Sequence, residues 1–392
     1  MTLFSSPKES YLGIDIGTAS IKVVQLEPFN NRPRLITYGY ADIATDIVHS
    51  RTQENQQKII ESLKKVLDIA KVSTHLVNAA LPTFSVFNSI ISLPPMSGKD
   101  LASAVKWEAK KYVPLPLEEM ILDWQMIKET ESNIITPQLR DKKMPAAGEK
   151  SFFSFLKGEK KAIKPAAVKK NKDSDNKNLN IRVLVTAAPK TLVSRYLAIF
   201  QAAGLKLLSL ETEAFALSRS LIGQDKSTIM IVDLGSITTD ICLIEQGVPV
   251  LNRSIDLGGL TITKAIASSL NINLERAEQF KRDFGISLNQ QETQKGINKT
   301  IATAIGPILN EIKYVFDLYQ AQVGANVEKI ILAGGSALLN NFDHYLEQLF
   351  NKPTVIGNPW DRVVYPVELK PVLDEVGSRL AVSIGLAMRD IK

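Results

Sequence analysis

Two segments of the chain place an aspartate two residues before a glycine turn. The first reads YLGIDIGTASIK over residues 11–22, and the second reads IVDLGSITTD over residues 231–240. Glycine allows the backbone of such a turn to approach an anion closely, so that amides and hydroxyls can face phosphate oxygens. A neighbouring carboxylate can hold Mg²⁺ through water, because Mg²⁺ keeps much of its hydration. One such turn is a common hairpin, but two of them 218 residues apart predict a phosphate site with magnesium.

A third segment, IILAGGSAL over residues 330–338, is an apolar strand that runs into paired glycines and then a helix. This geometry leaves a flat backbone surface for a base or ribose and exposes the amides of the helix start. A lone Gly-Gly pair is usually only a tight turn between strand and helix. Because this one follows the two hairpins in order, we interpret it as part of a nucleotide site.

The elements around these motifs alternate between strands and helices, as in α/β proteins. The opening stretch reads as β-β-β-α-β, with its helix at 53–70. Residues 228–259 repeat the hairpin pattern. Helices are expected at 100–112 with Asp100 as N-cap, and at 189–203, 261–285, 297–322, 338–350 and 379–389. Further strands are expected at 86–93, 122–127, 181–188, 205–210 and 329–333.

Composition excludes several other classes of protein. The 392 residues are enough for several structural units, and the single cysteine, Cys242, rules out an intrachain disulfide and indicates a reducing compartment. The three histidines lie far apart, which argues against a Cys/His zinc site. No apolar run approaches the length of a membrane span, and the first ten residues do not resemble a signal peptide.

The net charge of +6 is concentrated in one segment. Residues 138–180 contain 12 basic and 5 acidic residues, and the basic run from Lys157 to Lys177 has no aromatic residue. A nucleic-acid-binding fold is usually basic over a folded face, so no nucleic-acid partner is expected. Residues 130–180 are predicted to be a disordered basic insert. A weak contact with an anionic membrane surface is the alternative for this segment.

The two hairpins and the Gly-Gly turn, in this order, resemble the nucleotide signatures of the actin/Hsp70/sugar-kinase superfamily. Within it the chain resembles the PilM-like proteins of type IV pilus assembly, which are related to the division protein FtsA. The resemblance is most specific in YLGIDIGTASIKVVQLE, in ISLPPMSGKDLASAVKWEAKKYVPLPLEEMILDWQMI and in GGLTITKAIA. It implies an α/β, actin-like (ribonuclease H-like), two-lobed ATP-binding fold with an inserted subdomain of the FtsA/PilM type.

The resemblance also implies a division into domains. Residues 8–81 would form the first actin-like subdomain, completed by 211–227 and the helix 379–389. Residues 82–210 would be the inserted subdomain. Residues 228–378 would form the second lobe, with a helical subdomain at about 261–322.

Site residues follow from matching the motifs of this family. The first hairpin would contribute Gly13, Asp15, Gly17, Thr18, Ser20 and Lys22, and the second Asp233, Gly235, Thr238 and Asp240. Gly334, Gly335 and Ser336 would lie along adenosine, and Glu278 and Lys281 would contact ribose or adenine unless they are an exposed helical pair. Asp15 and Asp233 would hold hydrated Mg²⁺. Glu213 would orient the attacking water as the catalytic acid, the alternative being a carboxylate that only stabilises a helix start.

The function implied is a cytoplasmic ATP-binding adaptor, peripheral at the inner-membrane face, with weak or no ATPase activity. Its partner would be the N-terminal tail of a PilN-like inner-membrane protein, in a groove between the first and inserted subdomains, with pilus motor ATPases as further candidates. Trp107 and Tyr112 could anchor that tail, unless they pack in the core.

Two alternatives remain open. An FtsA-like cell-division or cytoskeletal ATPase would predict a C-terminal amphipathic helix, whereas this sequence ends in AMRDIK. A sugar-kinase-type phosphotransferase would need a carboxylate base at the sugar, and residues 82–127 show no clear motif of that kind.

Overall fold

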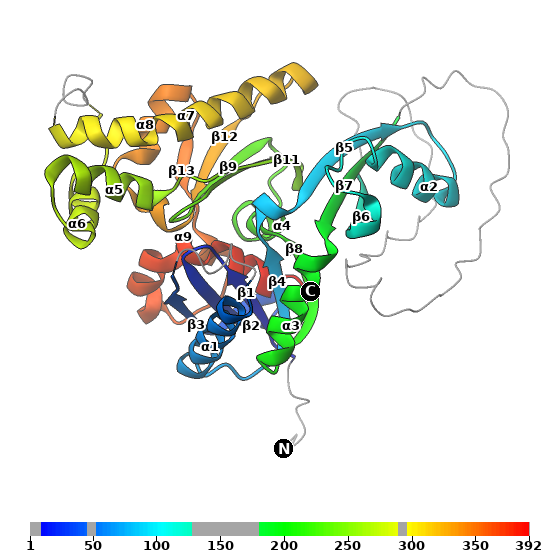
Figure 1. The fold of residues 1–392 in the computed structure, drawn as a ribbon, viewed down its shortest axis with the longest axis horizontal. Coiled ribbons are helices and arrows are strands. Elements are labelled where there is room, and N and C mark those ends of the chain that lie inside the picture. The colour runs from blue at the N-terminus through cyan, green and yellow to red at the C-terminus, as the bar shows by residue number, and fades with distance from the viewer. Residues whose placement is uncertain (1–8, 45–51, 128–179, 289–295, 392) are drawn as a thin grey trace. The chain divides into compact units, whose positions relative to one another are not determined.

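A computed structural model describes residues 9–44, 52–127, 180–288 and 296–391 (Figure 1). The predicted disordered insert lies outside these residues, apart from its last position. The chain divides into two compact units. The large unit comprises Met1–Val86 and Thr191–Lys392, and the small unit comprises Phe87–Lys190. The segment expected as an inserted subdomain, 82–210, therefore includes the small unit together with residues of the large one.

The large unit contains two five-stranded sheets with the same arrangement. The first has the order β3-β2-β1-β4-β8 and the second β11-β10-β9-β12-β13. In each, a three-stranded antiparallel meander is followed by two parallel strands. The strands of the first are β1 (Tyr11–Ile16), β2 (Ser20–Phe29), β3 (Arg32–Asp42), β4 (Leu76–Leu81) and β8 (Lys206–Thr212). Those of the second are β9 (Ile229–Leu234), β10 (Thr239–Glu245), β11 (Val248–Ile255), β12 (Lys329–Ala333) and β13 (Thr354–Ile356).

Three helices belong with the first sheet: α1 (Gln53–Ile69), α3 (Lys190–Ala202) and α9 (Lys370–Ala387). In α1, Ile59, Leu63 and Val66 recur at helical spacing and are buried. The start of α1 is capped by Thr52, whose side chain accepts a hydrogen bond from the backbone N–H of Asn55. Helix α9 packs on β1 and β2. We call the first sheet with these three helices the first lobe, and the second sheet with its helices the second lobe.

The second lobe carries α5 (Gly259–Leu270), α6 (Leu274–Phe284), α7 (Gly296–Val323) and α8 (Phe342–Phe350). The segment expected to be helical over 261–285 forms two helices, α5 and α6, with a break at 271–273. Asn271 ends α5 in the left-handed conformation, with φ of 51°, and Asn273 caps α6 by accepting from the N–H of Arg276. The helix expected over 338–350 is shorter than predicted, because a 3₁₀ turn, Gly335–Leu338, precedes α8.

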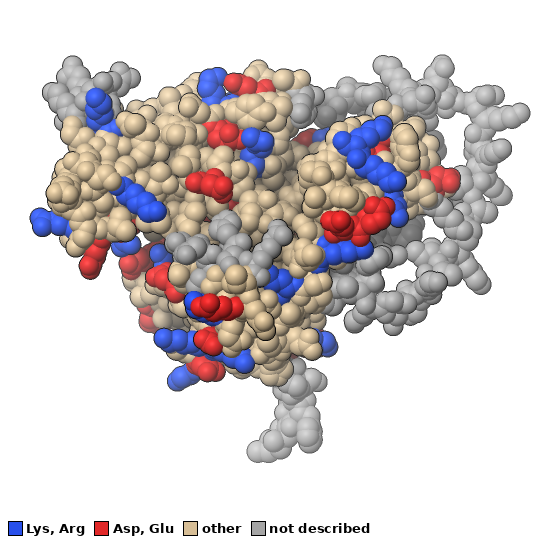
Figure 2. All heavy atoms as spheres, viewed as in Figure 1, with Lys and Arg blue, Asp and Glu red and all other residues tan. Residues whose placement is uncertain are grey.

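Two further features of the large unit concern its core and its surface. The lone cysteine, Cys242 on β10, is fully buried between the second sheet and α9. None of the helices in the described ranges is long and apolar enough to cross a membrane. Where described residues face the viewer in Figure 2, acidic and basic side chains lie interspersed.

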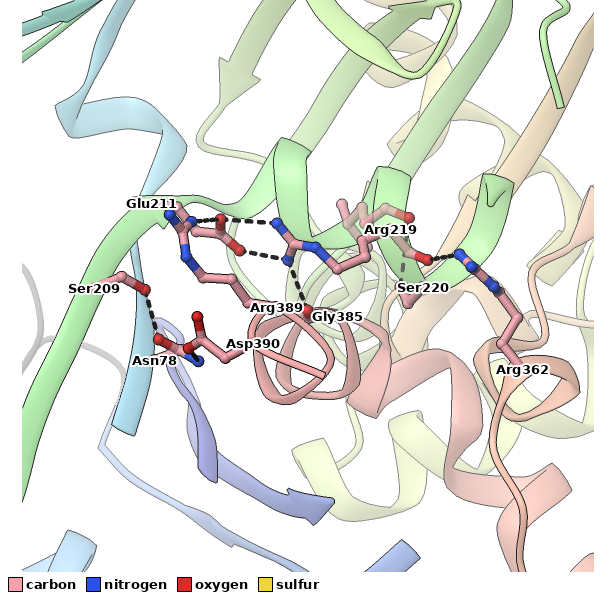
Figure 3. A network of polar contacts seen from close by, with 10 residues as sticks. Asn78, Ser209, Glu211, Arg219, Ser220, Arg362, Gly385, Arg389 and Asp390 are labelled. Atoms are coloured by element: carbon pink, nitrogen blue, oxygen red, sulfur yellow. Dashed lines mark hydrogen bonds and ion pairs between the residues drawn. The ribbon is translucent and has the colours of Figure 1, made fainter. Parts of the chain in front are cut away.

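A polar network ties the end of α9 to the first sheet (Figure 3). Arg219, in the π-helical turn Ser218–Ile222 after α4 (Glu213–Leu217), donates to both carboxylate oxygens of Glu211 at 2.7 and 3.0 Å. Arg219 also donates to the carbonyl of Gly385 at 2.6 Å, and Arg389 binds the same carboxylate. The network thus satisfies a buried carboxylate and a carbonyl in the last turn of α9.

The small unit is a three-stranded antiparallel sheet with one helix. Its order is β5-β7-β6, with β5 (Phe87–Leu93), β6 (Met120–Ile127), β7 (Ile181–Pro189) and α2 (Gly98–Ala109). Ser97, rather than Asp100, is the N-cap of α2, and the two side chains hydrogen-bond at 2.5 Å. Leu101 and Val105 of α2 are buried against the sheet, which leaves the opposite face of the helix exposed.

Candidate functional site

The two Asp-x-Gly turns close in the same way. The N–H of Gly17 donates to the carbonyl of Ser20 at 3.0 Å, and the N–H of Gly235 donates to the carbonyl of Thr238 at 2.9 Å. In each hairpin the aspartate is the last residue but one of the first strand, so it stands at the same position beside its turn. The repeated pattern of the sequence is therefore a repeated structure.

Both turns and the Gly-Gly segment line one cavity of about 690 Å³ in the large unit. The predicted site residues that line it are Asp15, Gly17, Thr18, Ser20, Lys22, Glu213, Asp233, Gly235, Thr238, Asp240, Glu278, Lys281, Gly334, Gly335 and Ser336. Gly13 does not line it. A Cβ on Gly13 would lie 1.9 Å from the carbonyl oxygen of Ser383, so this glycine allows α9 to close onto β1.

The charges beside the two turns differ. Opposite Asp15 stands Lys22, and their side chains form an ion pair at 2.7 Å. Opposite Asp233 stands a second acid, Asp240. Burial lowers the pKa of Lys22, but the charge and the hydrogen bond of Asp15, together with the charges of Asp233 and Glu213, outweigh burial and raise that pKa. The first turn thus holds its own counter-charge, whereas the second has none within its hairpin.

The environment of the second turn disfavours the ionised form of its two aspartates. Burial raises the pKa of Asp233 to about 6; the charge of Lys22 opposes this shift, and the charge of Asp15 adds to it. Burial also raises the pKa of Asp240 to about 7, with further contributions from Asp233 and Asp15. A cation bound between these groups would relieve their repulsion.

The residues present fit a hydrated Mg²⁺ ion. Within the described ranges, no three acidic, histidine or cysteine side chains are grouped to ligate a metal directly. Oδ1 of Asp240 is buried without a hydrogen-bond partner there. Mg²⁺ prefers oxygen ligands and keeps several waters, so Asp15 and Asp233 would hold it through water, and Asp240 could accept from another of its waters.

Glu213, the first residue of α4, is anchored by one of its oxygens. Oε2 accepts from the N–H of Thr83 at 3.0 Å and from the hydroxyl of Thr83 at 2.6 Å. Both bonds end on Oε2, which leaves Oε1 as the oxygen that could orient a water. Burial, together with the charges of Asp240 and Asp15, raises the pKa of Glu213 well above its usual range.

Glu278 and Lys281 form an ion pair in which Lys281 is buried, so they are not an exposed helical pair. Lys281 is only 7% exposed. Its Nζ lies 2.6 Å from Oε2 of Glu278, 3.1 Å from the hydroxyl of Thr263 and 3.2 Å from the carbonyl of Gly259. Burial lowers the pKa of Lys281, although Glu278 opposes this shift. The pair joins α6 to the start of α5 and forms a wall of the cavity.

The Gly-Gly turn is fixed against the second hairpin. Gly334 has a φ of +85°, and a Cβ there would lie 2.4 Å from Oδ1 of Asp233. The hydroxyl of Ser336 donates to the carbonyl of Gly235 at 3.1 Å. A side chain at position 334 is therefore excluded both by the backbone and by its neighbour.

Several residues that line the cavity belong to none of the sequence motifs. Tyr40 comes from β3, and Glu375, Ser378 and Arg379 come from α9. The guanidinium of Arg379 lies over the ring of Tyr40, 4.9 Å from its centroid. No motif surrounds these residues in the sequence, and only the packing of α9 on the first sheet brings them to the site.

The two predicted partner-binding residues lie on the surface of the small unit. Trp107 is 64% exposed and Tyr112 is 47% exposed. Neither belongs to the core of this unit, so the alternative that they are core residues is wrong. Nζ of Lys111 lies 4.8 Å from the centre of the Trp107 ring, which holds the indole on the surface.

Comparisons with known proteins agree with this architecture. A solved PilM–PilN type IV pilus biogenesis complex contains a chain that is 23% identical, with a TM-score of 0.74, and the match covers 98% of this chain and 100% of that one. The ethanolamine utilization protein EutJ from Carboxydothermus hydrogenoformans is 16% identical, with a TM-score of 0.51 and coverage of 97% and 90%. The cell division protein FtsA of Staphylococcus epidermidis (strain ATCC 35984) is 23% identical over 401 residues, 95% of this chain and 79% of FtsA.

A family model for the type IV pilus assembly protein PilM matches residues 13–147 and 167–391. The matched ranges contain both Asp-x-Gly turns, the Gly-Gly turn and most of the small unit. The family and the fold expected from the motifs are thus confirmed: the chain has an actin-like α/β fold and belongs to the PilM family of type IV pilus assembly proteins.

Proposed function

We propose that this chain is an ATP-binding adaptor of type IV pilus assembly. Mg-ATP would bind in the cavity of the large unit, and the small unit would hold an extended segment of a PilN-like inner-membrane protein. The observation that carries the nucleotide part is the convergence of two matched Asp-x-Gly turns and a Gly-Gly turn on one cavity. The adaptor would then be held at the cytoplasmic face of the inner membrane through its partner.

The size and charge of the cavity support a magnesium–nucleotide complex. Its volume of about 690 Å³ lies in the range usual for small-molecule sites. The carboxylates of Asp15, Asp233 and Asp240 would repel a free polyphosphate. Mg²⁺ bound between them would offset the negative charge of both the phosphates and the carboxylates.

The small unit supports the partner role. Trp107 and Tyr112 are exposed aromatic side chains, a residue type enriched among interface hot spots. In the sheet of this unit β5 and β6 are both edge strands, and an edge strand can pair with an added extended peptide. The solved relative in complex with PilN supports a PilN-like partner. Pilus motor ATPases remain further candidate partners.

A titration calorimetry experiment tests both parts. The ligands are Mg-ATP and a synthetic peptide of the N-terminal cytoplasmic segment of a PilN-like protein from the same genome. Both should bind, and Trp107→Ala should weaken the peptide alone. Tyr314→Ala is the matched control, because Tyr314 is also an exposed aromatic under a cation, 48% exposed and 5.2 Å from Arg253, but lies on α7. Absence of Mg-ATP binding would refute the nucleotide part, and equal peptide affinity in both variants would refute the assignment of Trp107.

A further inference from the structure

Four cationic side chains line the nucleotide cavity, and three of them are already paired. They are Lys22, Lys281, Arg282 and Arg379. Lys22 pairs with Asp15 at 2.7 Å, and both Lys281 and Arg282 pair with Glu278, at 2.6 and 3.3 Å. Arg379 makes no ion pair with the part of the chain that the structure describes. Its charge is therefore available to a ligand.

Arg379 is held in a defined orientation. The carbonyl of Ser378 accepts a hydrogen bond from the N–H of Gly334 at 2.9 Å, which fixes this part of α9 against the Gly-Gly turn. The Cζ of Arg379 lies over the ring of Tyr40, 4.9 Å from its centroid. A Cβ built on Gly335 would lie 3.4 Å from Nε of Arg379, 3.7 Å from Nη2 and 4.0 Å from Cζ. The edge formed by Nε and Nη2 thus points towards the Gly-Gly turn.

This edge carries two parallel N–H donors, the arrangement that binds phosphate or carboxylate in a bidentate manner. The cavity is otherwise rich in acids, since Asp42 and Glu375 line it in addition to the predicted acidic residues. An anionic ligand in such a cavity needs positive groups besides Mg²⁺. Ser378 adds a buried hydroxyl that has no hydrogen-bond partner among the described residues.

We propose that Arg379 binds a phosphate group of the nucleotide through its Nε and Nη2 donors. The proposal rests on the proposed nucleotide function and adds to it a phosphate-binding residue outside the hairpins and the Gly-Gly turn. Phosphate is favoured over the base because Nε and Nη2 present two donors on one edge, while Cζ already lies over the ring of Tyr40. The charge-assisted bonds of its edge are also stronger than neutral ones. Arg379 extends from α9 of the first lobe to a turn of the second, so a bound phosphate would join the two lobes.

The test compares Mg-ATP, Mg-ADP and adenosine binding to the full chain by calorimetry. Arg379→Ala should weaken Mg-ATP and Mg-ADP by about tenfold to a hundredfold, the value of a hydrogen bond to a charged group, and leave adenosine unchanged. Arg379→Lys should be intermediate, because it keeps the charge and loses the bidentate geometry. Arg276→Ala is the matched control, since Arg276 also lies on a helix over an aromatic ring, 5.8 Å from Phe280, but does not line the cavity.

The outcomes separate this inference from the proposed function. If the wild type does not bind Mg-ATP, the proposed function fails and Arg379 has no phosphate to bind. If the wild type binds and both Arg379 variants bind equally well, the inference alone is refuted. An equal loss for adenosine and Mg-ATP would also refute it, because the contact would then be to the base or ribose. The lysine variant keeps most of the side-chain packing, so it decides the matter if the alanine variant does not fold.

Discussion

Replacing Asp240 by asparagine should stabilise the protein in the absence of ligand. Asp240 is 8% exposed and its pKa is raised to about 7 by burial and neighbouring acids. Because the folded state favours the neutral carboxyl, the stability of the wild type falls as the pH rises from the unfolded pKa of about 3.8 through about 7. The asparagine side chain does not ionise, so the variant escapes this loss.

The expected gain follows from the size of the shift. Roughly three pKa units correspond to about 4 kcal/mol, an upper limit that is reached only above the folded pKa. The repulsion is distributed over Asp240, Asp233 and Glu213, so one substitution removes only part of it. The buried amide of the variant also costs about 1 kcal/mol. The expected gain is therefore about 2 kcal/mol at pH 8. At about pH 4.5, less than one unit above the unfolded pKa, only about 1 kcal/mol of the loss has developed. The cost of the amide offsets that amount, so the gain there should be close to zero.

Urea unfolding followed by circular dichroism, in EDTA at about pH 4.5 and about pH 8, measures this difference. Asp225→Asn is the matched control, because Asp225 pairs with Lys329 at 2.6 Å and that bond lowers its pKa. The control should lose a little stability at both pH values. If Asp240→Asn gains nothing at the higher pH, or gains equally at the lower one, the account of repelling acids is refuted. Mg-ATP should stabilise the wild type more than the variant, because Asp240 would then help to hold the ion.

Three further predictions follow from the site, the small unit and the polar network. Asp15→Ala and Asp233→Ala should each weaken Mg-ATP binding at least tenfold, because each removes a carboxylate that would accept a hydrogen bond from a water bound to Mg²⁺. Unchanged affinity of both variants in calorimetry would contradict the assignment of the site. Trp107→Ala should change the free energy of unfolding by less than about 0.5 kcal/mol, because the side chain is exposed; a larger loss in denaturation would show a packing role. Glu211→Gln should cost about 3 kcal/mol or more by urea denaturation, because it breaks a buried ion-pair network and leaves its arginines uncompensated; a loss below about 1 kcal/mol would contradict that role.

The two Asp-x-Gly hairpins were predictable because their information is local. A strand, an Asp-x-Gly turn and a second strand determine a register within about ten residues, and the pairing of Asp15 with Lys22 follows from that register. The break between α5 and α6 also had a local signal, since Asn271 and Asn273 favour helix ends.

The remaining site residues could not be predicted, because they depend on tertiary packing. Arg379 comes to the cavity only because α9 returns to the first sheet after the second lobe is complete. For Gly13 the sequence motif predicted a ligand contact, whereas in the structure this residue packs against α9. For Trp107, helical spacing left core and surface both open, and only the packing of α2 decides between them.

The buried position of Cys242 makes this chain suitable for measuring how far apart its two lobes lie in solution. Burial raises the pKa of the thiol well above its usual value, and the thiolate is the form that reacts with maleimides. It is the only cysteine of the sequence. Cysteines introduced on the surfaces of the two lobes should therefore be labelled selectively, without first removing the native thiol. Paired fluorescent or spin labels could then follow the separation of the lobes as nucleotide is added.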